Sequence, residues 1–216
     1  MSDIKTYECF PTIITGFSLN ISHEDMKEEI ERLINGKDRR IHFVDKPQIQ
    51  DGSINLQVLT QTEDNLHKNN YFITFVKEIF LKTKLILDEQ GLIYDDIEIT
   101  GMWANEITKG KIHAPHTHSN NFLSGVYYLH APDNTSPIQF FDPRPQASIF
   151  RPYNNMNFNQ ADLLSFKAKE GIGYIFPSWL MHWVPESGND KRVSISWNII
   201  VRGAYGQPNS LQNANI

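Results

Sequence analysis

The chain contains little cysteine and no long apolar run. One of its 216 residues is a cysteine, Cys9, so no disulfide can form within a single chain. This fits a reducing compartment without requiring one. No apolar run approaches the roughly 20 residues that a membrane helix needs, and the first residues, MSDIKTYECF, lack the apolar stretch of a secretory signal. We therefore expect a soluble, cytoplasmic protein.

The chain also lacks a block of basic residues. Its 20 Lys and Arg against 25 Asp and Glu give a net charge of −5, and the pI is about 5.9. Surfaces that bind nucleic acid or anionic membranes usually carry clustered lysine and arginine. We therefore predict neither kind of partner. The content of hydrophobic residues, 40%, is enough for a sizeable core, and the length suits one domain over residues 1–216.

The first 95 residues are predicted to form a support of helices and one short strand. The segment TIITGF, residues 12–17, has the composition of a strand. A helix follows, which Ser22 can cap and which Gly36 can end, because its apolar residues recur at helical spacing. A second helix is predicted from His67 to about Leu87 on the same grounds.

From Ile97 onward the pattern changes to many short strands. Runs rich in Ile, Val, Phe, Tyr and Trp alternate with turn residues, a pattern typical of a sandwich or a jelly roll. The predicted strands lie in IEITGMWANEI, KIHAPHTH, FLSGVYYLHAP, IQFFDPRP, LLSFKA, GYIFPSWL, HWVPES and RVSISWNIIV. We predict a mainly β protein with a double-stranded β-helix (jelly-roll) core at residues 96–203, N-terminal helices packed on it, and a tail at 204–216. Residues 145–160 are predicted to form a long loop, which in compact domains often has a function.

Three histidines are the main candidates for a functional site. Residues i and i+2 of a strand share a face, so His116 and His118 of HAPHTH should point the same way. Two imidazoles at that spacing can bind one metal ion, each with a ring nitrogen at about 2.0–2.2 Å. His182, which follows a Gly/Pro-rich turn and begins another strand, is the best candidate for a third ligand.

An arginine and a serine follow on a later strand. Arg192 and Ser194 of KRVSISWNII share one strand face. The guanidinium group matches a carboxylate with two parallel hydrogen bonds. We therefore interpret this pair as a receptor for the far carboxylate of a dicarboxylate, in preference to a solvated arginine paired with Glu186 or Asp190. Trp103, Trp179 and Trp183 are candidates for the walls of the same cavity.

The motifs PHTHSNNFLSGVYYL, FFDPR, YIFPSWLMHWVPES and RVSISWN together resemble the iron(II)/2-oxoglutarate-dependent oxygenases. More narrowly, the sequence is similar to a group of small 2OG-Fe(II) oxygenases found in bacteria and phages, and the resemblance covers about residues 97–200. It implies a jelly-roll core, one iron(II), 2-oxoglutarate as co-substrate, and dioxygen. For a phage-encoded chain the expected location is the host cytoplasm.

The resemblance also implies roles for single residues. His116 matches the family's first metal histidine and His182 its distal histidine. Arg192 matches the arginine that binds the C5 carboxylate of 2-oxoglutarate, and Ser194 matches its hydroxyl partner. Tyr128 resembles a tyrosine that contacts 2-oxoglutarate in members similar to prolyl hydroxylases. Tyr127 is the alternative if the strand register differs by one residue.

One position departs from the family pattern. The usual ligand set is two histidines and one carboxylate, and the acid stands two residues after the first histidine. This chain has His118 there. Three interpretations are open: His118 is a third imidazole ligand, water fills the position while His118 stands aside, or a carboxylate comes from elsewhere, with Asp142 the nearest candidate. We favour His118.

The resemblance predicts an enzyme, a 2-oxoglutarate-dependent dioxygenase whose default reaction is hydroxylation. Its substrate, a small molecule or a peptide, cannot be derived from the sequence, and a homodimer is left open. Two other functions remain. GKIHAPHTH fits the first cupin motif, which would give a metal-dependent enzyme or binding module without 2-oxoglutarate, although the glutamate expected after His118 is missing. A jelly roll used only for assembly is the third alternative.

Overall fold

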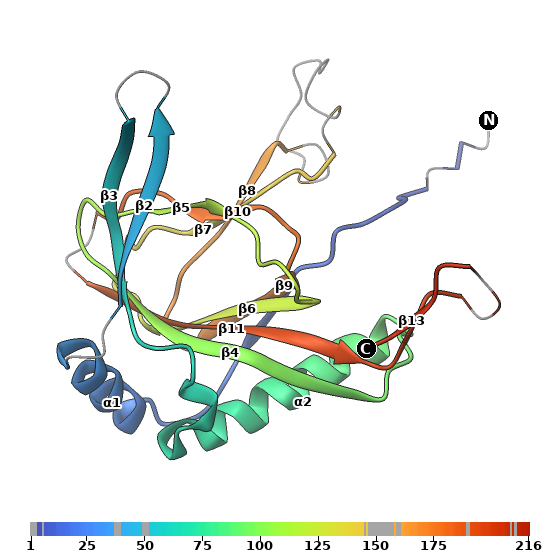
Figure 1. Ribbon diagram of the computed structural model, residues 1–216, viewed down its shortest axis with the longest axis horizontal. Coiled ribbons are helices and arrows are strands. Elements are labelled where there is room, and N and C mark those ends of the chain that lie inside the picture. The colour runs from blue at the N-terminus through green and yellow to red at the C-terminus, as the bar shows by residue number, and fades with distance from the viewer. Residues whose placement is uncertain are drawn as a thin grey trace.

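The computed structural model of the chain is built on two facing β-sheets (Figure 1). It describes residues 4–5, 7–36, 40–48, 52–144, 146, 158, 161–188, 191–207, 209 and 211–216. Nearly all of the loop predicted at 145–160 lies outside these residues. Within the described part of the chain, no helix is both long and apolar enough to cross a membrane.

The larger sheet has seven strands in the order β1-β9-β6-β11-β4-β3-β2. Every pairing in it is antiparallel, although most neighbouring strands are far apart in the sequence. Its strands are β1 (Thr15–Ser18), β2 (Arg40–Gln48), β3 (Gly52–Gln61), β4 (Asp96–Ile107), β6 (Leu123–His130), β9 (Ile172–Pro177) and β11 (Arg192–Arg202).

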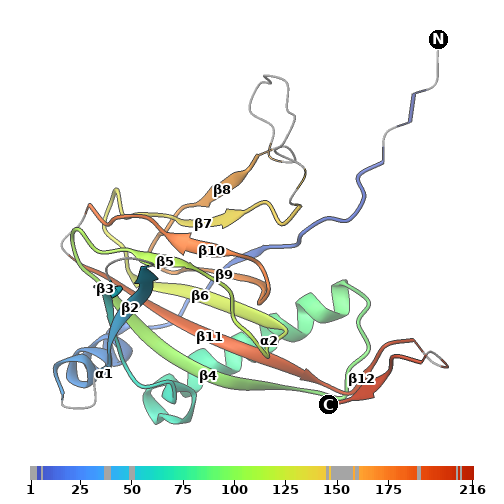
Figure 2. The same cartoon turned by 45° about the horizontal axis from the view of Figure 1, so that its top comes forward.

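The smaller sheet has four strands in the order β5-β10-β7-β8 and lies over the larger one (Figures 1 and 2). Its strands are β5 (His113–His116), β7 (Ile138–Phe141), β8 (Leu163–Phe166) and β10 (His182–Val184). A separate two-stranded ribbon, β12 (Ala204–Tyr205) with β13 (Ala214–Asn215), ends the chain. The predicted mainly β fold with a double-stranded β-helix core is confirmed, and each of the eight predicted strand segments contains an observed strand.

Two α-helices lie beneath the larger sheet, on the side away from the smaller one (Figure 1). They are α1 (Glu24–Asn35) and α2 (Ile73–Glu89). The prediction that Ser22 caps the first helix was wrong: His23 occupies the cap position, and its side chain makes no capping hydrogen bond.

The second helix begins later than predicted. Two 3-10 turns, η1 (Leu66–Lys68) and η2 (Asn70–Phe72), occupy the region where we expected its first residues. The side chain of Asn69 accepts a hydrogen bond from the backbone N–H of Tyr71, at 3.0 Å. Such a local side-chain bond offers the backbone an alternative to the α-helix, and the α-helix starts only at Ile73.

The N-terminal part also contains a hairpin that the sequence reading missed. Strands β2 and β3 pair antiparallel from Arg40 with Gln61 to Gln48 with Gly52, and β3 continues the larger sheet beyond β4. The hairpin extends past the smaller sheet at one side of the molecule (Figure 1). The dipeptide Asp51-Gly52 between two alternating segments was the available signal, because Asp-Gly favours tight hairpin turns.

Strand alternation gives the larger sheet two buried faces of different composition, an apolar face against the helices and a more polar face toward the smaller sheet. On β6 and β11, Tyr127 and Trp197 face the helices and pack with Phe75 in the main core. Tyr128 and Arg192, from the other face of the same two strands, point into the space between the sheets. Because neighbouring residues of a strand point to opposite faces, the helical core holds the sheet from below while the upper face carries polar side chains.

Candidate active site

Three histidines meet between the two sheets. His116, His118 and His182 each offer one ring nitrogen, and these three atoms lie within 4.8 Å of one another. The Nε2 atoms of His118 and His182 are 3.3 Å apart. Two nitrogens bound at about 2.1 Å to one ion are separated by roughly 3.0–3.4 Å. This pair therefore already has the spacing that a shared metal ion would need.

Strand pairing places two of the three rings. His116 ends β5 and lies directly across from His182, the first residue of β10. His182 also lies across from Phe140 of β7 on its other side. The register of the smaller sheet thus brings together two histidines that are 66 positions apart in the sequence.

His118 is placed differently from our expectation. We predicted that it shares a strand face with His116, but β5 ends at His116 and His118 lies in the following turn. Its ring nevertheless reaches the cluster, with its centroid 5.0 Å from that of His116 and 5.2 Å from that of His182. The prediction that these rings lie together was right, although strand geometry was the wrong reason.

Backbone carbonyls fix the tautomers of two rings. Nδ1 of His116 is 2.7 Å from the oxygen of Ala114, and Nδ1 of His182 is 2.8 Å from the oxygen of Leu180. A carbonyl oxygen can only accept, so each Nδ1 carries the proton and donates it. Each Nε2 then presents a lone pair, which is the arrangement that metal-binding histidines commonly show.

Burial keeps two of the rings neutral. Desolvation is the main cause that lowers the pKa of His118 to about 4 and the pKa of His182 to about 3, and proximity to His116 adds to both shifts. At neutral pH these imidazoles are therefore uncharged. A neutral imidazole is the form that binds a metal, so no proton has to be displaced.

A buried arginine lies deeper in the same space. Arg192 is 3% exposed, and its guanidinium carbon lies 5.3 Å from the centre of the Tyr128 ring. One amino group donates to the backbone oxygen of Ser136 at 3.0 Å. Among the described residues no carboxylate pairs with it, and Glu186 in particular does not; Asp190 lies outside these residues. Burial lowers the pKa of Arg192, but arginine remains a cation in proteins.

Three polar atoms in this part of the cavity have no hydrogen-bond partner among the residues that the structure describes. They are Nε of Arg192, Oγ of Ser194 and the hydroxyl oxygen of Tyr128, and all are buried. A buried polar group without a partner costs about 1–3 kcal/mol. Two hydroxyl donors and a cation that converge without an acceptor fit an anionic ligand. Arg192 and Ser194 are the pair that the sequence predicted for a carboxylate, and Tyr128 is the residue that the resemblance predicted to contact 2-oxoglutarate.

The two neighbouring tyrosines are separated by the strand. Tyr128 lines the cavity with Arg192, whereas Tyr127 points to the helical side, where its hydroxyl group lies 2.8 Å from Nε2 of His23. Burial raises the pKa of Tyr128 to about 12, so its phenol is neutral and can donate a hydrogen bond. Of the two tyrosines considered for contact with 2-oxoglutarate, Tyr128 is therefore the one on the cavity side.

Asp142 lies away from the three rings. Its carboxylate accepts hydrogen bonds from Nε and Nη2 of Arg144, at 3.0 and 2.9 Å. It is not among the described groups that could hold a metal ion with the histidines. The tryptophans also differ. Trp103 lines the cavity, Trp179 is exposed, and Trp183 packs on Phe141 with a ring-centroid distance of 6.4 Å.

A polar cluster that the sequence reading did not identify forms one wall of the cavity. Asn105 on β4 is 3% exposed, and its amide oxygen accepts from Nε2 of Gln61 and Nε1 of Trp103 at 2.8 and 3.1 Å. Its amide nitrogen donates to Oγ of Ser196 at 2.9 Å. The alternation of Trp103, Asn105 and Ile107 could have indicated one face of β4, but not which face.

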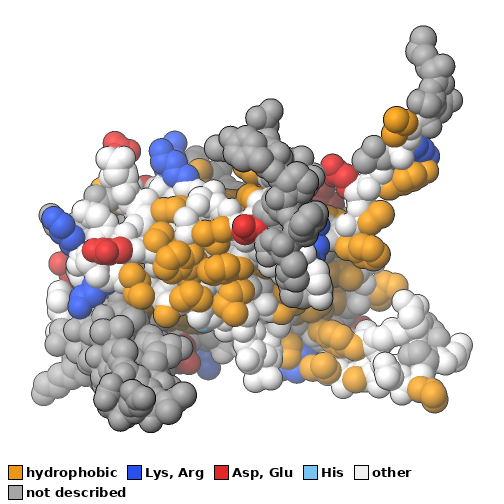
Figure 3. All heavy atoms as spheres, turned by 90° about the horizontal axis from the view of Figure 1, so that it is seen from above, with side chains coloured by type: hydrophobic (Ala, Val, Ile, Leu, Met, Phe, Trp, Pro, Cys, Tyr) orange, Lys and Arg blue, Asp and Glu red, His pale blue; other side chains and the backbone are white. Residues whose placement is uncertain are grey.

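A second, larger hollow lies beside the histidines. It has a volume of about 430 Å³, and Phe140 and Leu180 form part of its lining, together with the N-terminal segment around Phe10. Phe140 also packs against His182, with ring centroids 5.8 Å apart. The surface over the smaller sheet is largely apolar (Figure 3). This hollow, which both apolar and charged side chains line, is therefore separated from His182 by Phe140.

Comparison with known proteins decides the family. Residues 101–198, which include all three histidines and Arg192, match the family described as "Putative 2OG-Fe(II) oxygenase". The chain belongs to the 2OG-Fe(II) oxygenase superfamily. This superfamily is defined by its use of iron(II) and 2-oxoglutarate, and membership favours the oxygenase prediction over the cupin-like and assembly alternatives.

Solved structures of other superfamily members have the same fold as this oxygenase. The epimerase SnoN from nogalamycin biosynthesis is 12% identical, with a TM-score of 0.60, and the match covers 93% of this chain and 83% of SnoN. A prolyl-4-hydroxylase from Pseudomonas putida is 10% identical (TM-score 0.58; 87% and 92% covered). A prolyl hydroxylase from Trichoplax adhaerens, solved with a peptide fragment, is 11% identical (TM-score 0.59; 87% and 83% covered). No curated protein matches the chain by sequence.

Proposed function

We propose that the protein is an iron(II)- and 2-oxoglutarate-dependent hydroxylase. The observation that carries this proposal is the buried Arg192, which has no carboxylate partner among the described residues and lies in the same cavity as three converging imidazoles. A buried cation without an anion is costly, so the cavity is suited to a ligand that brings a carboxylate. An assembly module would have no use for this arrangement.

His116, His118 and His182 would hold the iron. Imidazole is a good ligand for iron(II), and the tautomers of His116 and His182 already expose the ligating nitrogens. When bound, iron(II) with 2-oxoglutarate supplies the oxidation of a substrate C–H bond by dioxygen, coupled to the conversion of 2-oxoglutarate to succinate and carbon dioxide. The chain's own part is to hold, orient and shield these reactants.

Arg192, Ser194 and Tyr128 would hold the far carboxylate of 2-oxoglutarate. The guanidinium supplies charge and direction, and the two hydroxyl groups would satisfy the remaining carboxylate lone pairs. The cavity they line is about 30 Å³, enough for a few water molecules. Entry of a five-carbon diacid would therefore require side chains at the cavity mouth to move.

The third imidazole changes the charge of the centre. With His118 in place of the usual carboxylate, the metal and its protein ligands would carry one more positive charge than in the usual set. We propose that this favours the doubly charged co-substrate and weakens retention of the metal alone. Water or Asp142 in the third position would be the alternatives, and Asp142 lies apart from the ring cluster, paired with Arg144.

Hydroxylation is our proposal for the outcome of the reaction. The structural neighbours include prolyl hydroxylases and an epimerase, so the fold itself is compatible with either outcome. We place the substrate, a small molecule or a peptide, in the hollow beside Phe140 and Leu180, because it is larger than the cavity between the sheets and Phe140 packs against His182.

An anaerobic titration tests the proposal. The metal-free protein is loaded with iron(II), 2-oxoglutarate is added, and the visible spectrum is recorded. Chelation of the co-substrate to iron gives a weak charge-transfer band, so we expect this band to grow and saturate. A cupin-like protein, or an assembly module whose histidines hold a metal structurally, would bind iron without giving the band.

A further inference from the structure

His118 is the one candidate ligand that no strand holds. The strand β5 ends at His116, and residues 117–122 form a turn before β6 begins at Leu123. A ligand on a loop is placed less precisely than one on a strand, although a metal site needs its ligands within about 0.5 Å of their positions. Something other than β-sheet pairing must therefore fix this turn.

Backbone hydrogen bonds fix the two ends of the turn. The N–H of His118 donates to the oxygen of Ser178 at 2.9 Å, and the N–H of Phe122 donates to the oxygen of Ile199 at 2.8 Å. Between these ends, Asn120 adopts a left-handed conformation with φ of 63°. Asparagine tolerates that region better than most residues do, which gives the first of the two asparagines in HTHSNNF a role.

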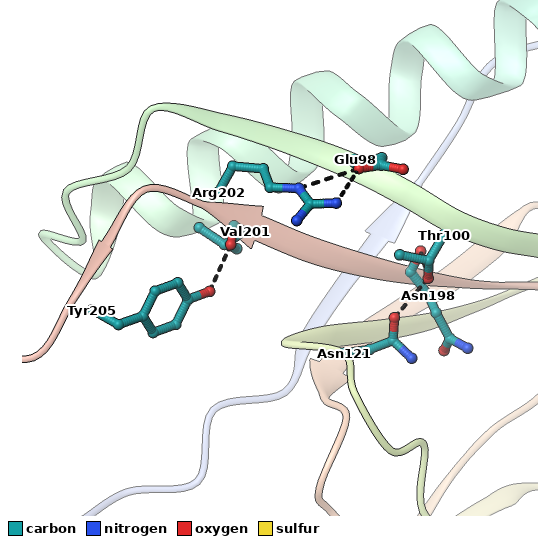
Figure 4. Close-up of polar contacts among 7 residues, drawn as sticks. All are labelled: Glu98, Thr100, Asn121, Asn198, Val201, Arg202 and Tyr205. Carbon is teal, nitrogen blue, oxygen red and sulfur yellow. Dashed lines mark hydrogen bonds and ion pairs between the residues drawn. The ribbon is translucent and has the colours of Figure 1, made fainter. Parts of the chain in front are cut away.

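The second asparagine joins the turn to the larger sheet. The amide oxygen of Asn121 accepts a hydrogen bond from Oγ1 of Thr100 on β4 at 2.6 Å, and its amide nitrogen donates to the backbone oxygen of Ser119 at 2.8 Å. Thr100 Oγ1 also lies 3.4 Å from the backbone oxygen of Asn198 (Figure 4). We call these hydrogen bonds of Thr100, Asn121 and Ser119 the clasp. The clasp links β4 to Ser119, the residue that directly follows His118.

We propose that Asn121 and Thr100 are positioning residues for His118. This inference rests on the proposed function, because it requires His118 to be a metal ligand. The clasp is exposed to solvent, so it does not act by filling the core. It limits the movement of the turn between its two backbone anchors, and thereby the position of the His118 ring relative to His182.

Cobalt(II) binding by the metal-free protein tests this inference without any turnover. Affinity is measured by competition with a chelator, and the visible spectrum of cobalt(II) reports its coordination. We expect Asn121→Ala and Thr100→Val each to weaken binding about 10-fold, as is typical when groups that orient a ligand are removed, and to alter the spectrum. Thr100→Ser keeps the hydroxyl group and should bind as the wild type does.

Glu98→Gln is the matched control. Glu98 lies two residues before Thr100 on β4, and its carboxylate pairs with Arg202 at 2.6 Å, not with the turn (Figure 4). This substitution should leave cobalt(II) affinity unchanged. The same variants are also made in a His118→Ala background. Residues that act only through His118 should cause no further loss there.

The outcomes separate the two proposals. Wild-type protein that binds no cobalt(II) would end the metal-site proposal itself. Wild type that binds cobalt(II), with Asn121→Ala and Thr100→Val binding within twofold of it, would overturn only the positioning role. A further loss in the His118→Ala background would also overturn it, because the clasp would then act on the fold in general.

Discussion

In the proposed site, a single guanidinium group would distinguish an oxygenase from a plain metal-binding protein. Arg192 is buried and has no carboxylate partner among the described residues. We expect Arg192→Ala to weaken 2-oxoglutarate binding by at least 10-fold, because a hydrogen-bonded charge contributes about 1.5–3 kcal/mol. The titration described above measures this, and iron(II) binding should be retained.

Arg202→Ala is the control for this prediction. Arg202 ends the same strand, but it is surface-exposed and pairs with Glu98. The variant should bind 2-oxoglutarate as the wild type does. Equal binding by Arg192→Ala and wild type would show that the co-substrate carboxylate is held elsewhere.

The tyrosine pair gives a second prediction at the same scale. Tyr128→Phe removes a buried hydroxyl that has no hydrogen-bond partner within the described part of the chain, so we expect weaker 2-oxoglutarate binding with little change in unfolding temperature. Tyr127→Phe removes the hydrogen bond to His23, which should lower stability by about 1 kcal/mol and leave co-substrate binding intact. Isothermal titration and thermal unfolding of both variants test this, and the reverse pattern would contradict the assignment of faces.

Sequence patterns could identify these residues but not all of their surroundings. His116, His182 and Arg192 carry motif spacing, and strand alternation separates Tyr127 from Tyr128. The position of His118 depends on the hydrogen bond that its N–H donates to Ser178. Its turn depends on a bond donated to the oxygen of Ile199 and on one accepted from Thr100, and all three partners are distant in sequence. A pattern among neighbouring residues cannot predict hydrogen bonds to such distant partners.

Helix α1 is held to the neighbouring 3-10 turns by one buried acid. Glu29 is 5% exposed and accepts hydrogen bonds from Nδ2 of Asn69 at 2.7 Å and from Nε of Arg32 at 2.7 Å. The hydrogen bond from Arg32 is the largest cause that lowers the pKa of Glu29 below 4.5, while burial opposes it. The ionised carboxylate therefore stabilises the folded state.

We expect Glu29→Gln to destabilise the protein by about 1 kcal/mol at neutral pH, because a neutral amide accepts the hydrogen bonds from Arg32 and Asn69 less strongly than a carboxylate does. A lowered pKa in the folded state means that this contribution is complete above the unfolded value of about 4.5 and is lost as the pH falls through the folded value. Thermal unfolding of both proteins from pH 7 to pH 3.5 should show their difference narrowing at the acid end. A difference that grows as the pH falls would refute this role.

Helices and strands with strong hydrophobic periodicity were predicted from the sequence, whereas those that depend on contacts elsewhere in the fold were not. The strands from β4 to β11 were predicted because alternating apolar residues and turn signals recur along that part of the chain. Strands β2 and β3 were missed, although Asp51-Gly52 lies between them, because a segment with Pro47 and several charges reads poorly as a strand. The delayed start of α2 depends on the local bond made by Asn69.

The whole molecule should respond to metal, because the three rings join two segments of the smaller sheet. A ligand that binds only the folded state at 100 times its dissociation constant adds about 2.7 kcal/mol of stability. For a chain of this size this corresponds to a rise of about 5–10 °C in unfolding temperature. Calorimetry with cobalt(II) tests this, and His182→Ala should show no rise. An equal rise in that variant would mean that cobalt(II) binds elsewhere.

The architecture of the whole molecule was predictable as a class, and the pairing of its strands was not. A jelly roll follows from many short strands at regular spacing. The order of the two sheets, and the register that sets His116 across from His182, depend on contacts between distant segments. The division at residues 95 and 203 remains a prediction.

The long sequence separation between the cross-strand partners His116 and His182 has a consequence for biosynthesis. A chain leaving the ribosome exposes His116 and His118 together, and His182 emerges only 64 residues after the second of them. Until then the growing polypeptide has an incomplete chelate, and its large sheet still lacks β11, the strand that carries the arginine. For the proposed three-histidine site, metal acquisition would therefore be a late event in the life of the nascent chain, because it requires the last quarter of the polypeptide to have been made.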